Sequence, residues 1–145
     1  MFLIFCLILA LAGAAPALSA PTATSAYNAA SYIKRGHVNG GLPQGGMFVV
    51  FGAGMGPVNL ALVSAFPIPT QLAGTQVRVT VGGATKLCPV VYTSAGQLAA
   101  ILPSDTPTGT GSLVVLFNGE ASPPLTVDVV KQAFGIFALS QAGFG

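Results

Sequence analysis

The sequence contains very few charged side chains. Eight of its 145 residues are Lys, Arg, Asp or Glu, which is 6%, against roughly 25% in an average soluble domain. Together with a hydrophobic content of 52%, this scarcity excludes a disordered acidic or basic chain, which needs many charges and little apolar content. A net charge of +2 spread along the chain does not form the basic stripe of a nucleic-acid-binding protein. We therefore expect no nucleic-acid partner.

Residues that bind metals or begin catalysis are equally scarce. The one histidine, His37, lies in a polar stretch that is typical of an exposed loop. The acids Asp105, Glu120 and Asp128 fall in a loop, a hairpin turn and the polar side of a strand, so they predict neither a glycosidase pair nor a calcium site. A single His with a single Cys cannot form a zinc site. The sequence therefore predicts no catalytic, cofactor-binding or metal-binding residue, no cofactor and no enzyme.

A glycine-rich stretch offers the one candidate for a nucleotide cofactor. Residues 52–56 read Gly-Ala-Gly-Met-Gly after an apolar run. The dinucleotide fingerprint needs Gly-x-Gly-x-x-Gly, a following helix and an acid about 20 residues later. None of these conditions is met, and the first acid after the stretch is Asp105. We interpret the stretch as a bend between strands.

The N-terminus predicts an export signal. Residues 2–12 are all apolar, and small residues with Pro16 follow. This run is shorter than the roughly 20 residues that span a membrane, and it matches a secretory signal peptide. We expect a signal-peptide helix over 1–19, with cleavage after Ser19, and a secreted or cell-surface protein that meets the membrane only through its leader before cleavage. Because no basic residue precedes Lys34, an uncleaved anchor or a different start codon stays open.

Only one cysteine, Cys88, would remain after cleavage. An intramolecular disulfide is then excluded, and the domain must be stabilised by packing. Because Cys88 lies in the apolar stretch 87–91, we expect it to behave as a small buried hydrophobe. A reactive thiol is the alternative.

The mature chain reads as short strands separated by turns. Residues 76–81 alternate strictly, with Val77, Val79 and Val81 on one side, which is typical of a strand with one buried face. Gly82-Gly83 and Asn118-Gly119 predict tight type I′ hairpin turns. Further strands are expected over 47–51, 86–92, 97–102, 113–117 and 125–129, with a last one over 135–139 and one or two helical turns over 59–66.

These elements predict an all-β fold: an immunoglobulin-like antiparallel β-sandwich of about seven short strands, preceded by the signal-peptide helix. We expect an extended N-terminal segment over 20–40, the sandwich domain over 41–140 and a tail over 141–145.

Two of the predicted strands are apolar on both sides. Residues 47–51 and 113–117 contain no polar residue, although the outer face of a free two-layer sandwich should be polar. Either the segment 52–74 or the termini cover these faces, or a neighbouring domain or subunit does. The candidate interaction residues are Met47, Phe48, Val50, Val114 and Leu116.

The order of short motifs along the chain resembles a known family. The motifs are Asn28-Ala29-Ala30-Ser31, residues 46–52 leading into Gly56-Pro57, residues 67–74, 79–83 and 91–98, Pro103, Asn118-Gly119 and Gly135-Ile136-Phe137. This set resembles the Solibacter-type uncharacterised C-terminal domain family of secreted acidobacterial proteins, and residues 77–103 are similar to immunoglobulin-like IPT/TIG domains. The resemblance implies an extracellular immunoglobulin-like module with no assigned activity. Since the family usually continues beyond this point, the tail predicts either a truncated fragment or a stand-alone copy.

We therefore expect a non-catalytic secreted module for cell-surface attachment or protein–protein assembly, with other protein domains or subunits as partners. A subunit of an extracellular filament built by β-strand addition is the nearest alternative. Alternatives of another class are a small secreted hydrolase that uses His37 and a carbohydrate-binding module, for which Tyr27, Tyr32 and Tyr92 would be the aromatic residues. The sequence identifies no small-molecule ligand and no oligomeric state.

Overall fold

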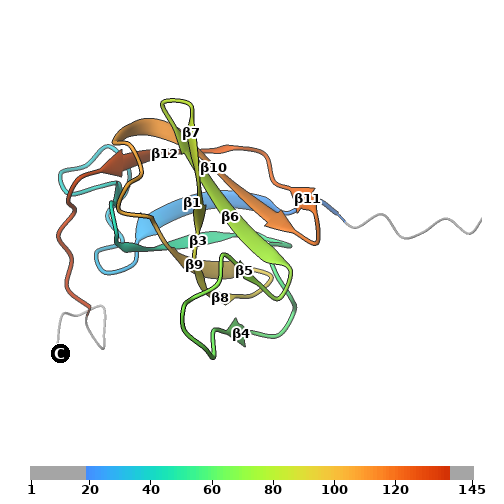
Figure 1. Ribbon diagram of the computed structural model, residues 1–145. Helices are drawn as coiled ribbons and strands as arrows, with labels where there is room; N and C mark the ends of the chain where they lie inside the picture. Colours follow the sequence, from blue (N-terminus) through green and yellow to red (C-terminus); the bar gives the residue numbers. More distant parts are fainter. Residues whose placement is uncertain (1–18, 138–145) are drawn as a thin grey trace, which may run out of the picture.

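The computed structural model describes residues 19–137, and throughout this range the chain forms strands, turns and loops (Figure 1). The strands are β1 (Thr22–Asn28), β2 (Leu42–Pro43), β3 (Met47–Ala53), β4 (Ala61–Leu62), β5 (Gln71–Leu72), β6 (Thr75–Val81), β7 (Ala84–Cys88), β8 (Val90–Thr93), β9 (Gln97–Ile101), β10 (Gly109–Phe117), β11 (Glu120–Ala121) and β12 (Leu125–Val130). The predicted all-β sandwich is confirmed. The predicted signal-peptide helix lies outside the described residues, and within them no helix is long and apolar enough to span a bilayer.

The strands form two sheets that pack face to face. One sheet has five strands in the order β1-β3-β9-β8-β4, all antiparallel. The other has seven strands, with β2-β12-β10-β6-β5 as its main path, β11 beside β10 and β7 beside β6. Its pairs are antiparallel except for β2 and β12, which run parallel. The expected purely antiparallel arrangement is therefore correct for all pairs but this one.

The core lies between the two sheets and is built by alternation. In β6, Val77, Val79 and Val81 point inward and are almost fully buried, while Arg78 points to solvent. Phe48 and Val50 of β3 meet them from the opposite sheet. The remaining core residues of the strands are Leu42, Cys88, Val90, Leu98, Ala100, Leu113, Val115, Val127 and Val129. In β6 and β12 burial follows the period-two alternation that positions the core, whereas β3 and β9 also bury Val49 and Ala99 on their outer side.

Both predicted hairpin turns are confirmed by their backbone angles. Gly82 and Gly83 have φ of +57° and +82°, and Asn118 and Gly119 have φ of +50° and +90°. Two successive positive φ angles are what a type I′ turn requires. The turn at Asn118 leads into the short β11, and the expected return strand follows as β12.

Four expectations about the elements need correction. The strand expected over 86–92 is divided at Pro89, because β7 pairs with β6 in one sheet and β8 pairs with β9 in the other. The helical turns expected over 59–66 are wrong, since this segment holds the short strand β4 and an irregular loop. No strand occupies 135–137, and the rest of that expected strand lies outside the described residues. Within 20–40, residues 22–28 form β1, which pairs with β3 as part of the sandwich.

Candidate functional site

The outer side of the five-stranded sheet carries a continuous apolar surface. The strand register aligns one outward-facing residue from each strand in a single row: Tyr27 of β1, Val49 of β3, Ala99 of β9, Tyr92 of β8 and Leu62 of β4. Val49 and Ala99, at the middle of the row, are only 3% and 0% exposed. Larger neighbouring side chains on the same face therefore cover them, because the part of the chain that the structure describes places no second sheet there.

The neighbouring rows complete this surface. Phe51 and Met47 flank Val49 on β3, and Gln97 and Ile101 flank Ala99 on β9. We call the whole set the outer face; it consists of Tyr27, Met47, Val49, Phe51, Leu62, Val91, Tyr92, Gln97, Ala99 and Ile101. It contains no charged residue, and Gln97 is its only amide.

Three aromatic rings cluster at one side of the outer face. The ring centroids of Tyr27, Tyr32 and Phe51 lie 6.2–6.3 Å from one another. Tyr32 reaches this position because the chain turns back after β1: its φ is +53° and its N–H donates to the Asn28 carbonyl at 3.0 Å. The ring planes are tilted by 35–57°, so they form a packed cluster rather than the single flat platform on which a sugar ring stacks.

A polar pair lies on β8 and β9, beside the aromatic cluster, since Gln97 is opposite Phe51. The Gln97 side-chain amide donates to the Tyr92 hydroxyl at 2.5 Å. Burial raises the pKa of Tyr92, the hydrogen bond from Gln97 opposes this rise, and the Tyr32 phenol adds to it. Tyr92 therefore stays protonated at neutral pH, and since its oxygen accepts from Gln97, its own hydrogen remains available to an acceptor on a partner.

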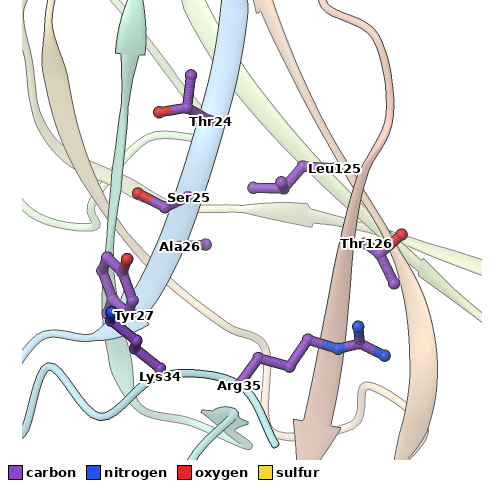
Figure 2. A pocket seen from close by; sticks show the side chains of 8 residues that line it. All are labelled: Thr24, Ser25, Ala26, Tyr27, Lys34, Arg35, Leu125 and Thr126. Carbon is purple, nitrogen blue, oxygen red and sulfur yellow. The ribbon is translucent and has the colours of Figure 1, made fainter.

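The sandwich is open along one edge, between β1 and β12. A cavity of about 240 Å³ lies there (Figure 2). Its lining residues are Thr24, Ser25, Ala26, Tyr27, Lys34, Arg35, Leu125 and Thr126. Ala26 and Leu125 also pack against the core, so the cavity has an apolar floor. β1 ends its sheet, and β2 pairs with β12 only at Val129 and Val130, so within the described chain both strands border the cavity with an edge that lacks a partner strand.

The five candidate interaction residues fall into three places. Met47 lies on the outer face, half-buried. Phe48 and Val50 are core residues with no exposed surface, so they are withdrawn as interaction residues. Val114 and Leu116 lie half-buried on the outward side of the other sheet, opposite Arg78 and Gln76 of β6. The two strands that are apolar on both sides therefore contribute to opposite faces of the molecule.

The titratable side chains do not converge. Asp128 forms an ion pair with Arg35 at 2.7 Å, and Asp105 forms another with Lys86. In each case the hydrogen bond from the basic partner is the main cause that lowers the pKa of the carboxyl group. Among residues 19–137, no group of three His, Cys, Asp or Glu side chains is placed to hold a metal ion.

His37 and Cys88 occupy the environments that their neighbours in the sequence predict. His37 is exposed in the loop between β1 and β2, where its backbone N–H donates to the Lys34 carbonyl and its carbonyl accepts from Gly40. Cys88 has no exposed surface, and burial raises the pKa of its thiol to about 12. The expectation that Cys88 is a buried hydrophobe is confirmed.

Most residues of the outer face were missed by the sequence reasoning. A signal was present: alternation in 47–51 puts Met47, Val49 and Phe51 on one side and Phe48 and Val50 on the other. No such pattern predicted the position of Tyr32, because it depends on the turn after β1 and not on alternation along a strand. Part of the cover over Val49 comes from this same turn, through Ala29, which lies in the N-terminal segment, one of the expected sources of cover.

No protein-family model and no curated protein matches the sequence.

Proposed function

We propose that the chain is a non-catalytic, exported module of immunoglobulin-like type that assembles with other copies of itself through the outer face. One observation carries the proposal: a sheet face on which residues 19–137 place no covering layer holds aromatic and large aliphatic side chains where polar residues would be expected. Contiguous apolar patches of this kind mark sites of association.

The composition of the outer face suits a protein surface. Interface cores are depleted of charge and enriched in Tyr, Phe and Met, and the outer face combines Tyr27, Phe51, Met47 and Tyr92 without any charged residue. Tyr32 adds a ring that is 50% exposed. The Tyr92 hydroxyl supplies a hydrogen-bond donor near the centre of the surface. A second copy of the chain would contact the outer face with its own outer face, because an interface with twofold symmetry uses the same surface on both copies.

Sedimentation velocity over a range of concentrations tests this proposal. We expect the wild-type chain to self-associate as its concentration rises, and Tyr32→Arg to weaken the association, because a charge would have to be buried at the interface. Leu87→Arg is the matched control, since Leu87 is 44% exposed on the outward side of the other sheet. A wild-type chain that stays monomeric at every concentration, or equal weakening by both substitutions, would contradict assembly through the outer face.

Strand addition at the open edge is a second candidate, and the cavity between β1 and β12 is the observation that favours it. A strand added there would find unpaired strand edges on both sides and an apolar floor at Ala26 and Leu125. The same measurement separates the two candidates. Thr126→Arg, at the exposed rim of the cavity, should abolish association by strand addition and leave association through the outer face unchanged.

A further inference from the structure

The segment between β3 and β5 exposes several large apolar side chains. Val58 is 91% exposed, Leu60 59%, Leu62 62% and Phe66 86%. We call residues 57–69 the apolar loop. In Figure 1 it runs along the lower margin of the molecule, beyond β5 and β8, and β4 is its only strand. Burial of these side chains in the fold does not explain their presence, because most of their surface remains in water.

The apolar loop contains no charged side chain, and its polar side chains are Asn59 and Ser64. No Lys, Arg, Asp or Glu occurs between residues 36 and 77. Three positions of the loop, Pro57, Pro67 and Pro69, have no backbone N–H to satisfy. In the middle of the loop, Ala61 and Leu62 pair with β8, and the Val63 N–H donates to the Val91 carbonyl at 2.9 Å. Entry of the loop into an apolar medium therefore does not require a charged side chain to leave water.

We propose that the apolar loop inserts into the interfacial region of a phospholipid bilayer. A lipid surface fits this loop better than a protein partner, because its most exposed apolar side chains stand on an irregular segment rather than on a flat sheet face, and insertion among acyl chains needs no complementary shape. Apolar side chains at membrane surfaces typically enter about 5–10 Å into the boundary between headgroups and acyl chains. Tyr92, which pairs with Leu62 across β4 and β8, would lie near the headgroups, where tyrosine is enriched.

The proposal differs from the sequence-based expectation that the membrane is met only through the leader. It shares Leu62 with the outer face but depends mainly on Val58, Leu60 and Phe66, which are not part of that face, so the two proposals are tested at different residues. Because the apolar loop has no basic residue, binding should not require anionic lipid and should change little with salt.

The absence of tryptophan from the chain allows a direct test with the full-length protein. Phe66→Trp places a single fluorophore in the apolar loop. Val38→Trp is the matched control, because Val38 is 89% exposed in the loop that carries Lys34, Arg35 and His37. Both variants carry the same leader, so attachment of the leader to lipid affects them equally. The probe is a vesicle of phosphatidylcholine with or without brominated acyl chains.

We expect vesicles to shift the emission of Phe66→Trp to shorter wavelength, and brominated lipid to quench it at least about twofold more than that of Val38→Trp. Adding Val58→Ser and Leu60→Ser to Phe66→Trp should raise the lipid concentration for half-maximal quenching by about tenfold or more. Equal quenching of the two tryptophans, or no quenching of Phe66→Trp, would overturn the proposal. A blue shift of Phe66→Trp that grows with protein concentration and needs no vesicles would overturn it in favour of a protein contact. Neither result affects the sedimentation test of the outer face.

Discussion

Two buried threonines show how single polar groups are accommodated in this core. Thr75 and Thr93 have no exposed surface. The Thr75 hydroxyl donates to the Met55 carbonyl at 2.9 Å, so the 2.9 Å contact between the two hydroxyls must use the hydrogen of Thr93. Each buried oxygen in this pair of hydrogen bonds thereby has a partner. The two bonds connect β6 of one sheet with β8 of the other and with Met55 in the bend after β3.

Thr75→Val should therefore be costly although it keeps the shape of the side chain. The substitution leaves the Thr93 hydroxyl and the Met55 carbonyl without this partner, and the free energy of unfolding should fall by about 1–3 kcal/mol. Urea unfolding at neutral pH measures the change. Thr80→Val is the control, because the Thr80 hydroxyl bonds to Thr85 at an exposed position, and it should change stability by less than about 0.5 kcal/mol. An equal loss of unfolding free energy in the two variants would contradict the stabilising role given to the buried hydrogen bonds of Thr75.

Asp128 predicts part of the pH dependence of stability. Its carboxylate accepts hydrogen bonds from Arg35 and from the Thr110 hydroxyl, both at 2.7 Å, and its pKa is lowered in the folded chain. A lowered folded pKa means that the stabilisation is complete above the ordinary pKa of about 3.9 and is lost as the pH falls through the lower folded value. Asp128→Asn should cost about 0.5–1 kcal/mol at pH 7, since the pair is partly exposed, and less at pH 3. Urea unfolding at the two pH values tests this, and an equal loss at both would rule out the ion pair as its source.

At the scale of elements, the turn between β10 and β11 allows the energetic cost of a left-handed backbone conformation to be measured without any steric clash. Gly119 has φ of +90°, and a Cβ atom added there would meet no atom within 4 Å. Gly119→Ala should therefore destabilise the chain by about 1–2 kcal/mol through the left-handed conformation alone. Gly96→Ala is the matched control, because Gly96 is also exposed but needs no positive φ; it should be neutral or slightly stabilising. Thermal unfolding of both variants checks the contrast, and a neutral Gly119→Ala would show that the turn relaxes.

The elements that the sequence predicted well are those with local causes. Alternation in 76–81 determines which side of β6 is buried, and Asn118-Gly119 determines a turn by its own backbone preferences. Pro89 is different. The residues on either side of it form one apolar run, and only the positions of β6 and β9 decide that β7 and β8 join different sheets. The segment 59–66 was similarly ambiguous, because short apolar runs do not distinguish strand, loop and helix.

The candidate site belongs to the scale of the whole molecule, which explains why so little of it was foreseen. The row from Tyr27 to Leu62 crosses five strands, and its members are separated along the chain by up to 72 residues, the distance from Tyr27 to Ala99. Its existence depends on strand order and register, and neither is encoded in any one segment. Met47 was identified because its own strand is apolar on both sides, whereas Ala99 and Val91 became part of the surface only through their neighbours.

The same long-range packing makes Cys88 a reporter of global unfolding. Its side chain lies in the core between the sheets, it pairs with Val77 of β6, and burial raises the pKa of its thiol to about 12. Reaction with a thiol reagent therefore requires both exposure and ionisation, and neither occurs in the folded chain near neutral pH. In a Cys6→Ser background, which removes the other cysteine, we expect the labelling of Cys88 to follow the fraction of unfolded chain across a urea titration. The free energy from labelling should then equal the value from circular dichroism. A markedly lower value would mean that β7 separates from β6 before the sandwich unfolds, and the two sheets would not act as one cooperative unit.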